Sequence, residues 1–253
     1  MTHTDKKADY QLGLSIFILL AFLTVAEYFV AVEFGSTFVL LLLAFAKGGL
    51  VLYYYMHAGK LLKDDSDAAH DSNRYKTNTN RLGLWLFMLS DSFVFGGLLV
   101  IRFGLMGLTR PELIPALGLL VTSVLLISSF YMNRAEMAMV HGDRKTFLTS
   151  LSITIFLGIA FLVGVVGVEW QLAPFGPADG PQGAVFYMMT GMHAFHVLTG
   201  VIFLLIVLRN GIKNVYTPEK HWAVEASAIY WHFIDLVWII FYPALYLIGK
   251  AVL

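Results

Sequence analysis

The stretch from Tyr230 to Tyr246, YWHFIDLVWIIFYPALY, decides how the rest of the chain is interpreted. It is an almost unbroken apolar run of the kind that spans a bilayer. His232 and Asp235 nevertheless lie inside it, three residues apart and so on one helix face. Strongly polar side chains are costly at bilayer depth and usually face other helices or a wet cavity. We therefore predict that this helix packs against protein.

The composition places the whole chain in a membrane. Hydrophobic residues make up 58% of its 253 residues and charged residues 13%, against roughly 25% charged in a soluble domain. Basic and acidic residues balance at 17 each and no basic block with interleaved aromatics occurs, so no nucleic-acid partner is expected. The absence of cysteine excludes thiolate metal sites, iron–sulfur clusters, disulfides and haem attachment through cysteine.

The hydropathy pattern predicts an all-α polytopic protein with seven transmembrane helices, each needing about 20 residues. The expected spans are residues 10–32, 37–57, 83–103, 113–132, 147–168, 184–208 and 226–249. We divide the chain into a two-helix hairpin (1–60), a polar cytoplasmic linker (61–80) and a five-helix bundle (81–253). Residues 170–183, which contain several Pro and Gly residues, are expected to form a non-helical external cap.

The distribution of basic residues predicts the orientation, because Lys and Arg accumulate in cytoplasmic loops. A cytoplasmic N-terminus puts most of them inside and leaves Arg102, Arg110 and Lys250 outside. The C-terminus is then external. The first apolar run is too long for a signal peptide, so we expect the first helix to be retained.

Glu27 and Lys47 are the charged residues of the first two spans. At 1.5 Å per residue their depths differ by roughly 10 Å, within reach of two long side chains. An ion pair inside the membrane is one interpretation. In the other, Glu27 snorkels outward and Lys47 meets a backbone carbonyl or a carboxylate of another subunit.

Polar residues of the later spans form a belt in the inner half of the membrane. Helical rise puts His232, Asp91, Asp235 and His196 at depths of roughly 9, 12, 13 and 18 Å from the cytoplasmic end. We predict that Asp235 accepts a hydrogen bond from a histidine of the sixth helix, with His196 as first choice. His193 and His196 share a helix face and could bind a metal. Because the facing candidates are carboxylates, we favour hydrogen-bonded histidines and expect no bound metal or haem.

Four segments in chain order resemble subunit III of haem-copper terminal oxidases. They are LWLFMLSDSFVFGG (84–97), FLVGVVGVEW (161–170), GMHAFHVLTGVIFLL (191–205) and EASAIYWHFIDLVWIIFYPALYL (225–247). The family has Glu at the position of Asp91 and commonly Gln at that of Val166. The second span, LLLAFAKGGLVLYYYMHAGK (41–60), resembles the small subunit IV of bacterial oxidases. The whole chain thus resembles a subunit IV hairpin fused to a five-helix subunit III.

The resemblance implies a non-catalytic accessory subunit of a proton-pumping oxidase in a bacterial inner membrane. Haem and copper would reside in partner subunits, with subunit I as the main contact and subunit II in the same complex. The chain would stabilise subunit I, bind phospholipid and support proton uptake. The family's carboxyl at the position of Asp91 reacts with hydrophobic carbodiimides and lies near lipid. Arg102, Arg134 and Arg209 are candidate contacts for lipid head groups.

Several alternatives stay open at this stage. Cytochrome c is preferred as the electron donor, but a quinol oxidase and a nitric oxide reductase have related accessory chains. A b-type haem anchor would use His196 and His232 as ligands. A small proton-coupled transporter would use Asp91, His232 and Asp235 as a relay.

Overall fold

The computed structural model describes residues 3–56 and 72–251, and this part contains seven helices long and apolar enough to cross a membrane. Their bounds are α1 His3–Glu33, α2 Thr37–Leu50, α3 Ser72–Met106, α4 Pro115–Val140, α5 Arg144–Leu162, α7 Gly180–Ile212 and α8 Trp222–Tyr242. Three of them continue through π-helical turns, α2 into η1 Val51–Tyr55, α5 through η4 Val163–Glu169 into α6 Trp170–Leu172, and α8 into η5 Pro243–Leu247.

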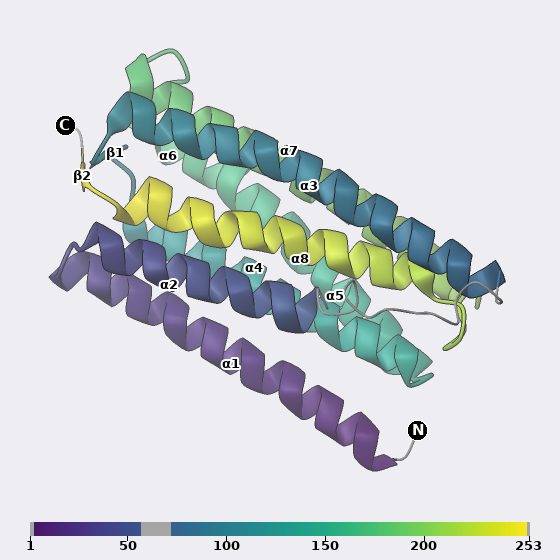
Figure 1. The fold of residues 1–253 in the computed structure, drawn as a ribbon. Helices are drawn as coiled ribbons and strands as arrows, with labels where there is room; N and C mark the ends of the chain where they lie inside the picture. The colour runs from purple at the N-terminus through teal and green to yellow at the C-terminus, as the bar shows by residue number, and fades with distance from the viewer. Residues whose placement is uncertain (1–2, 57–71, 252–253) are drawn as a thin grey trace.

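Helix α8 is the centre of the bundle (Figure 1). Of its apolar window 89% is buried, against 17–44% for the other six described spans. It contacts α2, α3, α4 and α7. The prediction that the Tyr230–Tyr246 stretch packs against protein is therefore confirmed.

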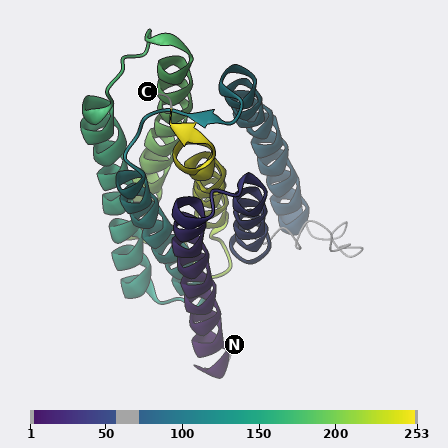
Figure 2. The ribbon, with the colours of Figure 1, turned by 90° about the vertical axis from the view of Figure 1, so that its left-hand side faces the viewer.

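The N-terminal hairpin and α3 lie on different sides of α8 (Figure 2). Helix α1 packs on α4 and α2 packs on α8, whereas α3 packs on α7 and α8. The hairpin is thus attached to the five later spans through side chains of α4 and α8. The assignment of the hairpin as a separate domain stays a prediction.

Two loop predictions were wrong in extent. Residues 72–80, assigned to the linker, form the first turns of α3, while residues 57–71, including His57, lie outside the described residues. In the segment predicted to form an external cap, Trp170–Leu172 and residues 180–183 are helical, so the non-helical part is 173–179. Both errors arise because a formed helix gains one hydrogen bond for each residue added, even where the sequence is polar.

The all-α prediction misses one small feature, a parallel pair of two-residue strands, β1 Thr109–Arg110 and β2 Lys250–Ala251. Gly249 precedes β2 with a φ of +97°. A side chain there would meet the Leu108 carbonyl, so glycine is required for the strands to approach. The strand pair connects residues 250–251 to the loop that follows α3.

Close helix packing around Trp231 predicts a sharp contrast between two glycines. A Cβ added at Gly158 of α5 would lie 2.6 Å from the buried Trp231 ring, whereas one at Gly96 of α3 would meet nothing. We expect Gly158→Ala to lower the free energy of unfolding by about 1–3 kcal/mol through overpacking. Gly96→Ala is the matched control and should be neutral or stabilising by up to about 1 kcal/mol. Unfolding in mixed detergent micelles, followed by tryptophan fluorescence, measures both, and equal stability of the two variants would contradict the packing.

Candidate functional site

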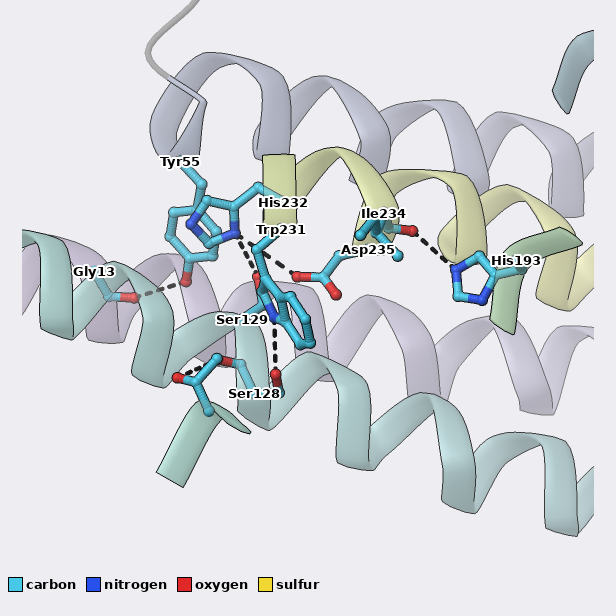
Figure 3. Close-up of polar contacts among 10 residues, drawn as sticks. Gly13, Tyr55, Ser128, Ser129, His193, Trp231, His232, Ile234 and Asp235 are labelled. Atoms are coloured by element: carbon cyan, nitrogen blue, oxygen red, sulfur yellow. Dashed lines mark hydrogen bonds and ion pairs between the residues drawn. The ribbon is translucent and has the colours of Figure 1, made fainter. Parts of the chain in front are cut away.

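A cluster of polar side chains from three elements lies inside the bundle (Figure 3). His232 Nδ1 of α8 forms a 2.8 Å hydrogen bond with Ser129 Oγ of α4 and lies 3.7 Å from Asp235 Oδ2. The Tyr55 ring of η1 lies 4.9 Å from the His232 ring, and its hydroxyl donates to the Gly13 carbonyl at 3.2 Å. All four of these polar side chains are almost fully buried. The cluster therefore joins the hairpin, α4 and α8.

His193 lies on another side of α8 and has a different partner (Figure 3). Its Nε2 donates to the Ile234 carbonyl at 3.1 Å, and its ring packs edge-on against Phe161 and tilted over Trp238. The side chain is fully buried. His193 thus holds α7 to α8 through a backbone contact.

His196 and Asp91 form a separate pair between α7 and α3. His196 Nδ1 donates to the Met192 carbonyl at 2.8 Å, and its Nε2 lies 3.5 Å from Asp91 Oδ2. The predicted hydrogen bond between Asp235 and His196 is therefore wrong. Helical rise predicts only the depth of each residue along its helix, and it does not say which side of the helix the residue faces.

The two rival functions lose geometric support from these pairings. His196 and His232, the proposed haem ligands, each contact a different carboxylate. The proposed relay of Asp91, His232 and Asp235 is divided between two pairs on different helices. Among the described residues, no group of three or more His, Asp or Glu side chains is close enough to hold a metal ion.

Glu27 of α1 and Lys47 of α2 are brought together. Lys47 Nζ lies 2.5 Å from Glu27 Oε2, and neither side chain is exposed. The intrachain ion pair is thus the interpretation that matches the structure, rather than snorkelling. It joins the two helices of the hairpin at bilayer depth.

Arg102 does not face lipid, and its assignment as a head-group contact was wrong. The side chain is fully buried and donates to the carbonyls of Ala244, Gly107, Thr109 and Ile248 at 2.7–3.0 Å. Carbonyls at the ends of helices lack partners within the helix and attract such a donor. Arg134 and Arg209 are exposed and stay candidates for lipid contact.

The hydroxyl residues of α4 that accept hydrogen bonds from large side chains of α8 were not among the predicted site residues. Ser128 Oγ accepts from Trp231 Nε1 and Thr122 Oγ1 accepts from Trp238 Nε1, each at 2.9 Å. The signal was present as small hydroxyl residues within an apolar span, which commonly mark helix contacts in membranes.

An apolar groove of about 560 Å³ lies where α3, α7 and α8 meet. At the first groove, Arg81 forms an ion pair of 2.8 Å with Glu225 and lies over the Trp222 ring. The residues that line it include Leu84, Phe87, Phe203, Ile206, Trp222 and Tyr230. Val166 lines a different apolar groove, between η4 and α7, together with Leu162 and Phe195, and the side chains that line this groove offer no polar partner to an amide.

These features define an integral membrane helix bundle in which buried polar side chains of neighbouring helices contact one another or backbone carbonyls. The chain matches the family model described as cytochrome c oxidase subunit III over residues 2–250. Similar proteins include "Cytochrome c oxidase subunit 3" of Gadus morhua and of Salmo salar, each 37% identical over 183 residues, and that of Sus scrofa at 36%. Each match covers 67% of this chain and 70% of the relative.

The chain therefore belongs to the cytochrome c oxidase subunit III family. Membership makes it a membrane-embedded subunit of a haem-copper oxidase, in a complex with other oxidase subunits. The family match runs through the hairpin as well as the later spans, so the derivation of the hairpin from subunit IV stays a prediction.

Proposed function

We propose that the chain is a non-catalytic scaffold of a proton-pumping cytochrome c oxidase that stabilises subunit I, binds phospholipid and supports proton uptake. The observation that carries the proposal is the match to subunit III over almost the whole chain. The pairing of buried histidines with neighbouring groups supports a structural use of these side chains. In this proposal the haem and copper are held by partner subunits and this chain binds neither.

Lipid binding is supported by the groove between α3, α7 and α8. Its wall is almost entirely apolar, as an acyl chain requires, and Trp222 and Tyr230 are of the type that lies near membrane interfaces. The exposed Arg134 and Arg209 could attract phosphate groups. We assign the groove to the acyl chain of a phospholipid.

The proposed setting is a bacterial inner membrane with the N-terminus in the cytoplasm. The excess of basic residues on that side supports the orientation. The subunit IV-like sequence of the second span supports a fused hairpin and, through it, a bacterial enzyme using cytochrome c.

Purification through a tag on this chain tests the proposal. We expect a haem-containing subunit I to accompany the chain from mild detergent, with all visible absorbance assigned to the partners after separation. An oxidase prepared without the chain should begin turnover normally and lose activity sooner than the intact complex. Haem retained by the isolated chain, or a chain recovered with no redox partner, would contradict the proposal.

A further inference from the structure

The cluster around His232 leaves polar atoms unsatisfied in a way that the scaffold role does not explain. Neither His232 Nε2 nor either carboxyl oxygen of Asp235 has a hydrogen-bond partner among the described residues. Buried polar atoms in native proteins are nearly always paired with protein or with ordered water. The pair therefore has capacity for water and for a proton.

A pocket toward the end of the bundle that carries the N-terminus is bounded by Tyr55, the outermost side chain of this cluster. It is lined by Asp9, Gly13, Tyr55 and Asn133, among other residues of α1, η1 and α4, and its volume is about 80 Å³. One water needs roughly 10–15 Å³ of such space, so several fit. Tyr55 lies between the pocket and His232, because its side chain lines the former and its ring contacts the latter.

We propose that Tyr55, His232 and Asp235 form an internal proton-binding site that exchanges with water through the pocket at Gly13 and Asn133. One proton shared by His232 and Asp235 leaves the pair neutral overall, whichever group carries it. Without that proton a carboxylate would be buried with no counter-charge, which the membrane interior penalises. Exchange replaces one proton with another from a pocket water, so charge and bonding are unchanged.

Several charged and titratable groups of the elements around α8 have partners elsewhere. Lys47 of α2 pairs with Glu27, and Asp91 of α3 pairs with His196. Arg102 of α3 is held by carbonyls, His193 of α7 by the Ile234 carbonyl, and Glu136 of α4 also has an interaction of its own. Tyr55 is a titratable side chain that contacts His232 from outside α8, with its ring centroid 4.9 Å from that of the imidazole.

Infrared spectroscopy of the complex during a change from H₂O to D₂O tests the site. Bands of protonated carboxyl or imidazole that shift in D₂O should be lost in Asp235→Asn or His232→Gln and retained in the matched control Asp91→Asn. Aspartate labelled with ¹³C identifies the carboxyl band without substitution, in case a variant does not assemble. No band that depends on either residue would overturn the proposal.

The pocket itself is tested by Asn133→Leu, which keeps the side-chain size and makes the mouth apolar. We expect exchange at the His232–Asp235 pair to slow by about tenfold or more, because the pocket loses polar partners that hold water. The final spectrum should be unchanged. Exchange at the original rate would overturn the route through the pocket. The readout needs no oxidase turnover, so the site and the scaffold role are tested separately.

Discussion

Lys47→Met is expected to destabilise the protein by about 3–5 kcal/mol, because removal of one partner of a buried ion pair leaves the other charge uncompensated. Lys47 and Glu27 are both fully buried. The second oxygen of Glu27, Oε1, has no hydrogen-bond partner among the described residues. The Glu27 carboxyl thus takes its hydrogen bond from Lys47. Titration with a denaturing detergent, followed by tryptophan fluorescence, measures the loss.

The control for this prediction is the double variant Glu27→Met with Lys47→Met. Replacing a whole buried pair by apolar residues of similar size is often neutral or stabilising by about 1–4 kcal/mol. We therefore expect the double variant to regain most of the stability lost by the single one. A single variant as stable as the parent protein would show that the pair does not hold α1 to α2.

Arg102→Leu has the second large expected effect, a loss of roughly 2–4 kcal/mol, since each buried polar group left unsatisfied costs about 1–3 kcal/mol and some carbonyls can relax. The guanidinium donates to carbonyls on both sides of the pairing between β1 and β2. Its loss should first free η5 and β2, which follow α8. Amide hydrogen exchange of residues 244–251 then rises before that of α8.

Arg102→Lys separates the charge from the geometry. Lysine keeps the positive charge but has three donors on one atom, whereas arginine spreads five over a planar fork. We expect a loss of stability between those of the leucine variant and the parent. Full stability of Arg102→Leu, with unchanged exchange of residues 244–251, would contradict the role of the hydrogen bonds.

The sequence predicted the spans well because apolar length is a local property. The sequence predicted the ends of the helices less well. Polar residues such as those at 72–80 extend a helix whose apolar part is already formed, because each added residue gains a hydrogen bond. The pair of two-residue strands has no sequence pattern at all, because its hydrogen bonds join segments that are distant in the chain.

The candidate site was predicted in composition but not in pairing. His196 lies against Asp91 and His232 lies near Asp235, and the first of these pairings depends on how α3 and α7 are rotated about their axes. A count of helical rise gives depth only. Arg102 illustrates the same limit. Its depth in the span suggested a contact with a lipid head group, whereas its side chain points to backbone carbonyls inside the bundle.

The central position of α8 has a consequence for biogenesis. Among the seven described spans it is synthesised last, yet it fills the middle of the bundle and supplies partners for hydroxyl groups of α4. Without α8 the hydroxyl groups of α4 would lose these indole partners, and lipid offers no replacement. We therefore expect a chain truncated before α8 to be a substrate for membrane proteases.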